Sequence, residues 1–141
     1  MTNPVTLRYM MRPDVLAVYA IEKMSFNHPW TVGDFIRCGR ERNYISVVAE
    51  IADEVIGYMI YDVHKHRFDL LNFAVHPDVR RCGIGMMMID KIKDRLSKDH
   101  VTECCWRSAK QTSAVSYFFG RWDSGPLRLF ATVSKMVVMR I

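Results

Sequence analysis

The feature that most constrains the fold is a glycine-bearing loop between an apolar strand and an amphipathic helix. The run from Phe68 to Val75 (FDLLNFAV) is typical of a buried strand, which the turn His76-Pro77-Asp78 ends. The loop from Arg80 to Gly85 (RRCGIG) follows. From the end of this loop onward, starting at Ile84, every fourth residue is apolar, which predicts a helix with one buried face. These apolar residues are Ile84, Met88, Ile92 and Leu96.

The composition of this loop favours phosphate binding. Pyrophosphate requires converging backbone N–H groups and a positive potential, and a glycine loop at a helix N-terminus supplies both. Gly83 and Gly85 let a phosphate approach the backbone because neither carries a Cβ. The alternative is an ordinary strand-to-helix connection with a glycine kink. The residues predicted to line the pyrophosphate are Arg80, Arg81, Cys82, Gly83, Ile84 and Gly85.

Upstream of the loop, the sequence predicts two helices and then a hairpin. The first helix is expected from about Pro13 to Met24, and Thr31 with Asp34 resembles a capping box that opens the second. The β-branched runs from Tyr44 to Ile51 and from Val55 to Val63 predict two strands joined by a tight turn. We therefore expect two helices before any strand.

Length and charge limit the classes of protein to consider. The 141 residues, half of them apolar, are enough for one domain and too few for two. The sequence shows no membrane span and no signal peptide, so we expect a cytoplasmic protein. Of the net charge of +5, residues 1–97 carry +1 (13 basic, 12 acidic) and residues 98–141 carry +4 (7 basic, 3 acidic). This basic tail is the only support for a nucleic-acid-binding domain, and we expect no nucleic-acid partner.

The strand, turn and loop resemble the coenzyme-binding motif of the GNAT acetyltransferases, Q/R-x-x-G-x-G/A after a strand that ends in V-x-P. Arg80, Gly83 and Gly85 match the motif, and Phe73 to Asp78 match the lead-in. The resemblance implies an α/β GNAT fold, a mixed central sheet flanked by helices, and acetyl-CoA as co-substrate. It also implies that the pantetheine arm meets main-chain groups of Phe73, Ala74 and Val75.

The first third of the chain is similar to the ribosomal-protein alanine N-acetyltransferase branch of that family. Ile21-Glu22, Ser25-Phe26 and Pro29-Trp30 match its I-E…S-F…P-W pattern. Together these matches cover residues 8 to about 97 and imply a protein N-terminal α-amine as acceptor, such as that of a ribosomal protein. In that branch Phe26 and Trp30 would line the acceptor entrance. The alternative is that these aromatic rings plug the core beside a proline turn.

The C-terminal third departs from this branch, whose members carry a glutamate in an L-E-V-R strand and a tyrosine about ten residues beyond its arginine. Arg107 and Tyr117 keep the interval, but Cys105-Trp106 stands where Glu-Val would be. Lys110 replaces the usual Asn, and Arg121-Trp122 replaces Gly-Phe. The sequence therefore assigns no catalytic base or acid. A catalytically impaired acyl-CoA-binding module is the alternative function.

A reading-frame error is our interpretation of this departure. From about Lys98 the hydrophobic period degrades. A shifted frame, with one choice of synonymous codons, restores L-E-V-R-E-x-N and G-F at the family spacing. We therefore predict an acetyl-CoA-binding core over 1–97 and an atypical, out-of-frame segment over 98–141. Its final strands and helix are expected to be disrupted, which would leave the edge beside Phe68 to Val75 poorly covered.

The cysteines and histidines do not indicate a metal site. The four cysteines lack C-x-x-C spacing, so we expect reduced thiols. His64 and His66 form an H-x-H pair, but the sequence shows no third ligand, and a strand end at the surface is the simpler interpretation. We therefore expect no metal. The cysteines are Cys38, Cys82, Cys104 and Cys105.

Overall fold

A computed structural model of the chain describes residues 4–64, 67–80, 82–97, 103–106 and 118–121. These residues form one six-stranded sheet whose strands follow each other in chain order. The strands are β1 (Thr6–Tyr9), β2 (Tyr44–Ile51), β3 (Glu54–Val63), β4 (Arg67–Val75), β5 (Glu103–Trp106) and β6 (Phe118–Arg121). The helices are α1 (Val15–Ser25), α2 (Val32–Cys38) and α3 (Ile84–Ser97), and the 3-10 turns are η1 (Arg12–Asp14) and η2 (Pro77–Val79).

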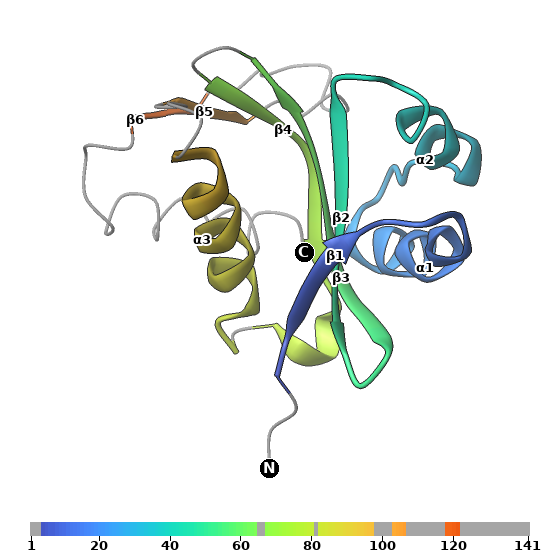
Figure 1. Ribbon diagram of the computed structural model, residues 1–141. Helices are drawn as coiled ribbons and strands as arrows, with labels where there is room; N and C mark the ends of the chain where they lie inside the picture. Colours follow the sequence, from blue (N-terminus) through green and yellow to red (C-terminus); the bar gives the residue numbers. More distant parts are fainter. Residues whose placement is uncertain (1–3, 65–66, 81, 98–102, 107–117, 122–141) are drawn as a thin grey trace.

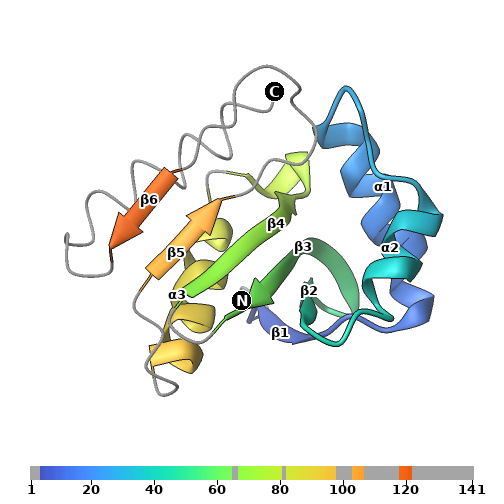
Figure 2. The same ribbon diagram turned by 90° about the horizontal axis from the view of Figure 1, so that it is seen from above.

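The sheet lies between two helical layers, with α3 on one face and α1 and α2 on the other (Figures 1 and 2). Met88 and Ile92 of α3 are buried on the first face, as the four-residue spacing predicts. Val18 of α1 and Phe35 of α2 are buried on the second. Because β4 and β5 are parallel and the other pairs antiparallel, the mixed sheet expected from the sequence is confirmed. None of the described helices is long and apolar enough to cross a membrane.

The predicted hairpin is present, with β2 and β3 antiparallel around Ala52 and Asp53. Both turn residues have positive φ, 50° and 67°. A two-residue loop in which both residues are left-handed matches the right-handed twist of the flanking strands. Thr31 and Asp34 form the predicted capping box at the start of α2.

The N-terminal order differs from the sequence-based expectation, because β1 precedes both helices. This strand has only four residues, too few for an alternating pattern to stand out, and it is defined by its antiparallel pairing with β2. The first helix also begins later than expected. Pro13 belongs to η1, and α1 starts at Val15.

Gly57 lies where β3 passes close to both β4 and α3. A Cβ at this position would stand 3.1 Å from the Ala74 carbonyl oxygen and 3.3 Å from the Met88 sulfur. We expect Gly57→Ala to lower the free energy of unfolding by about 1–3 kcal/mol, measured by urea denaturation. Gly33→Ala is the control, because its Cβ would meet only Thr31 Oγ1, at 3.6 Å. Equal stability of Gly57→Ala and the wild type would contradict this packing.

Arg8 of β1 fastens the N-terminal strand to its neighbours. Its Nη1 lies 2.6 Å from Asp14 Oδ2, and its Nε lies 3.0 Å from Glu50 Oε2. The hydrogen bond from Arg8 holds the pKa of Asp14 below its ordinary value. A carboxyl group whose pKa is lower in the folded state stabilises the fold above its unfolded pKa, about 3.9 for aspartate. That stabilisation is lost as the pH falls through the lowered folded-state pKa.

We therefore expect Asp14→Asn to lower the melting temperature at pH 7. The difference from the wild type should shrink as the pH falls through the acid range, because the wild-type carboxyl group is then protonated too. Thermal melts at a series of pH values test this. Asp90→Asn, at an exposed position of α3, should change the melting temperature little at any pH. A deficit in Asp14→Asn that is the same at pH 7 and in strong acid would refute the electrostatic origin.

Two short strands extend the sheet within the segment that was expected to be disrupted. β5 pairs with β4 over Arg67–Leu70, and β6 pairs with β5. The edge of β4 is thus covered along its first four residues, because main-chain hydrogen bonding does not require the family's side-chain pattern. The reading-frame error stays a prediction. Four positions that were compared with the catalytic pattern of the acetyltransferase branch lie outside the described residues, namely Arg107, Lys110, Tyr117 and Trp122.

Candidate active site

The glycine loop enters α3 through a left-handed residue, Gly83, whose φ is 79°. This conformation strains any residue with a Cβ, so glycine is required here by the backbone itself. Apart from its two chain neighbours, no atom of the described residues lies within 4 Å of the place that a Cβ at Gly83 would take. The part of the chain that the structure describes therefore leaves room for a ligand at this side of Gly83.

The start of α3 presents backbone donors to this open space. The Gly83 carbonyl accepts a hydrogen bond from Met87 N at 3.0 Å, so the helix begins directly after Gly83. The first amides of a helix, here from Ile84 and Gly85 onward, have no acceptor within the helix and lie at its positive end. The side chain of Ile84 is buried and anchors the loop in the core, whereas Cys82 and Gly83 are exposed. This geometry can bind an anion such as a pyrophosphate.

The side chain of Arg80, at the start of the loop, is held by two hydrogen bonds. Its Nε donates to the Val75 carbonyl oxygen at 2.9 Å, and its Nη2 donates to Ser25 Oγ at 2.8 Å. Ser25 Oγ in turn donates to the Ile21 carbonyl oxygen at 2.7 Å. The Arg80 side chain thus joins the end of β4 to the end of α1 and positions the loop. Arg81 lies outside the described residues.

The last residues of β4 offer main chain rather than side chains to a ligand. The side chains of Phe73 and Val75 are buried toward α3, and that of Ala74 is buried toward α1 and α2. β3 pairs with one edge of this segment. On the other edge, the pairing with β5 ends at Leu70 of β4. Leu71–Val75 has no strand partner there among the described residues. An extended ligand could bind along this edge by main-chain hydrogen bonds.

A buried acid, Glu22 of α1, links the helical layer to the sheet. Its exposed fraction is 1%. Oε1 accepts from the backbone N–H of Trp30 at 2.8 Å, and Oε2 accepts from Asn72 Nδ2 at 2.9 Å. The Tyr58 hydroxyl also donates to Glu22 Oε2. The family pattern in the sequence included Glu22 but did not indicate its hydrogen-bond partners. The sequence signal for a buried Glu22 was the presence of an acid beside Ile21 on the apolar face of the helix.

Phe26 and Trp30, the residues predicted to line the entrance for the acceptor substrate, lie at the two ends of the loop from α1 to α2. Phe26 caps α1, its N–H donating to the Glu22 carbonyl oxygen at 3.0 Å. The Trp30 ring packs against Phe35, with 5.5 Å between ring centroids. Both rings are half-buried against the cluster beneath α1 and α2. They therefore contribute to the core and also keep exposed surface, and their contact with an acceptor stays a prediction.

The loop, the strand and the sheet between two helical layers define a class of protein. Residues 42–122, more than half of the chain, match the family model described as the acetyltransferase (GNAT) domain. The chain belongs to the GNAT acetyltransferase family. This confirms the resemblance found in the sequence.

The chain is similar to several individual acetyltransferases in sequence and in structure. The ribosomal protein bS18-alanine N-acetyltransferase of Salmonella typhimurium is 26% identical over 111 residues, which cover 79% of this chain and 74% of that enzyme. The crystal structure of the ribosomal-protein-S18-alanine N-acetyltransferase from Escherichia coli superposes with a TM-score of 0.68 at 23% identity, covering 78% and 70% of the two chains. PaiA N-acetyltransferase from Thermoplasma acidophilum, solved with coenzyme A, gives a TM-score of 0.61 at 13% identity, covering 78% and 82%.

Proposed function

We propose that this chain transfers the acetyl group of acetyl-CoA to the N-terminal α-amine of a protein, such as a ribosomal protein. The observation that carries the proposal is the loop from Arg80 to Gly85, where a left-handed Gly83 opens the start of α3 to an anion. The ribosomal protein bS18-alanine N-acetyltransferases of Salmonella typhimurium and Escherichia coli, each 26% identical to the chain over 79% of its length, support this choice of acceptor.

The coenzyme would be held chiefly by the backbone. Its pyrophosphate would meet the N–H groups of residues 81–85 at the positive end of α3. Its pantetheine arm would run along Phe73, Ala74 and Val75, on the edge of β4 that has no strand partner among the described residues. Arg80 would hold the loop in place through Val75 and Ser25, and its positive charge lies nearby.

The acceptor would approach over the loop between Phe26 and Trp30, which Glu22 fixes to the sheet. An α-amine with a pKa of about 8 is largely protonated at neutral pH, so it must lose a proton before it attacks the thioester carbonyl. The new C–N bond then forms as the C–S bond breaks. The sulfur leaves as a thiolate, which takes up a proton.

An acetylation assay tests this function. The full chain is incubated with acetyl-CoA and a peptide that begins with alanine, and the product is mapped by mass spectrometry. We expect the acetyl group on the α-amine, and none on the same peptide with a blocked N-terminus. Binding of acetyl-CoA without transfer to any amine would reject the enzyme in favour of an acyl-CoA-binding module. Failure to bind acetyl-CoA would reject both.

A further inference from the structure

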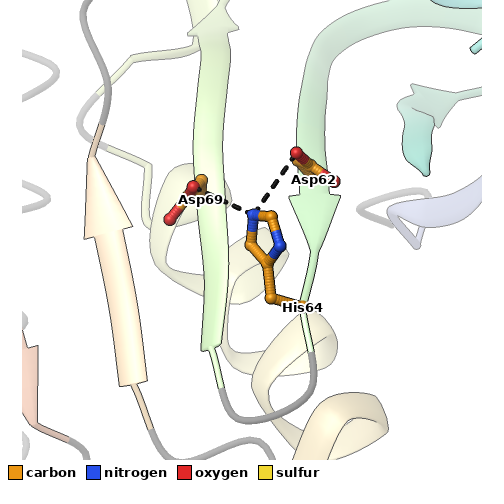
Figure 3. Close-up of side chains that lie close together, drawn as sticks. All are labelled: Asp62, His64 and Asp69. Atoms are coloured by element: carbon orange, nitrogen blue, oxygen red, sulfur yellow. Dashed lines mark hydrogen bonds and ion pairs between the residues drawn. The ribbon is translucent and has the colours of Figure 1, made fainter.

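Two aspartates and a histidine lie close together near the end of β3 and the start of β4. Asp62 of β3 and Asp69 of β4 are direct partners in the antiparallel register. Figure 3 shows the His64 ring beside both aspartates, with dashed lines from the same ring nitrogen to each of them. His64 Nε2 lies 3.1 Å from Asp69 Oδ2 and 3.4 Å from Asp62 Oδ2.

This cluster concentrates acceptors around a single ring nitrogen. Like charges directly opposite each other on neighbouring strands are destabilising. One imidazole nitrogen carries at most one proton, so it cannot donate fully to two carboxyl groups. Within the part of the chain that the structure describes, Asp62 Oδ1 is also buried without a hydrogen-bond partner. A cation among the three side chains would offset each of these costs.

We propose that Asp62, His64 and Asp69 bind a divalent transition-metal ion, with Zn²⁺ as the best match. One ligand atom from each residue lies within 4.8 Å of the other two. Two ligands bound tetrahedrally to one zinc ion lie about 3.3 Å apart, given Zn–N and Zn–O bonds of about 2.0–2.2 Å. The two separations from His64 Nε2, 3.1 Å and 3.4 Å, bracket this value.

The donor set and its surroundings define the kind of ion. An imidazole with two carboxylates suits zinc, whereas Mg²⁺ and Ca²⁺ prefer oxygen ligands alone. The Asp69 side chain is 2% exposed and anchors the site, while the His64 side chain is 41% exposed and leaves a path for the ion. Three protein ligands leave a fourth position for water. The sequence alone missed this site because the pairing of β3 with β4 is what places Asp62 and Asp69 opposite each other beside His64.

Calorimetric titration of the full chain, stripped of metal with EDTA, with ZnCl₂ tests the site. We expect one zinc ion per chain, and an affinity lower by about tenfold or more in His64→Gln and in Asp62→Asn. His76→Gln is the matched control, because the Nδ1 of His76 lies 3.8 Å from Asp78 Oδ2 in a pair that forms no three-ligand group among the described residues. This control should bind zinc as the wild type does.

A second readout separates a lost ligand from a damaged fold. Zinc should raise the melting temperature of the wild type and of His76→Gln, but not that of a folded His64→Gln chain. Asp62→Asn keeps the shape of the side chain and serves if His64→Gln does not fold. The absence of saturable zinc binding to the wild type would overturn the site. So would undiminished affinity in His64→Gln and Asp62→Asn, or tighter binding of Mg²⁺ or Ca²⁺ than of zinc.

Discussion

Replacing Gly83 with valine is expected to abolish acetyl-CoA binding. The backbone at Gly83 has a φ of 79°, which a β-branched residue adopts only with strain. The new side chain would also enter the open space in front of the loop, where we place the pyrophosphate. Gly85→Val, in the first turn of α3, should act in the same direction. Calorimetric titration with acetyl-CoA measures both effects.

Gly33→Val is the matched control for this experiment. Gly33 lies in the exposed part of α2, where a Cβ would make only an ordinary contact with Thr31 Oγ1 at 3.6 Å. We expect its affinity for acetyl-CoA to equal that of the wild type. If Gly83→Val and Gly85→Val both keep full affinity in folded protein, the pyrophosphate does not bind at this loop.

Replacing Glu22 with alanine is expected to cause the largest loss of stability, about 3 kcal/mol or more. Three donors would lose this acceptor, namely the backbone N–H of Trp30, the Asn72 amide and the Tyr58 hydroxyl, the last of which also donates to Asn72 Oδ1 at 3.3 Å. Each buried polar group left unsatisfied costs about 1–3 kcal/mol, and the missing side chain also leaves a cavity. Urea denaturation measures the change in the free energy of unfolding.

The same change at an exposed acid, Glu41→Ala, is the comparison, and it should alter stability by less than about 0.5 kcal/mol. Glu22→Gln keeps the shape of the side chain and one acceptor oxygen, so its loss should fall between the two. A Glu22→Ala chain as stable as Glu41→Ala would show that the network does not hold α1 to the sheet.

The sequence predicted those elements whose pattern is long or whose turn chemistry is strict. The helix from Ile84, the hairpin around Asp53 and the capping box at Thr31 are in the structure. β1 was missed because four residues hold too little periodicity, and its partner strand is distant in sequence. The coverage of β4 by β5 was missed for a related reason, since pairing there depends on main-chain groups and not on side-chain pattern.

The candidate site was predictable where a motif fixes the backbone and unpredictable where distant residues meet. The loop was predictable from its glycines, and the left-handed backbone of Gly83 is a conformation that favours glycine. The link from Arg80 to Ser25 joins residues 55 positions apart, and that from Asn72 to Glu22 joins residues 50 apart. Local sequence reasoning has no access to such contacts. It therefore placed Arg80 among the residues that line the pyrophosphate, whereas the structure also gives it a positioning role.

The most direct test of the account is a titration of the ¹⁵N-labelled chain with acetyl-CoA, followed by backbone amide NMR. The central claim is that amides at the start of α3 bind the coenzyme's pyrophosphate. We predict saturable shifts that are largest at Cys82, Gly83 and Gly85, smaller ones along Phe73–Val75, and little change in β1. Saturable shifts centred elsewhere, with the amides of residues 82–85 unmoved, would contradict it.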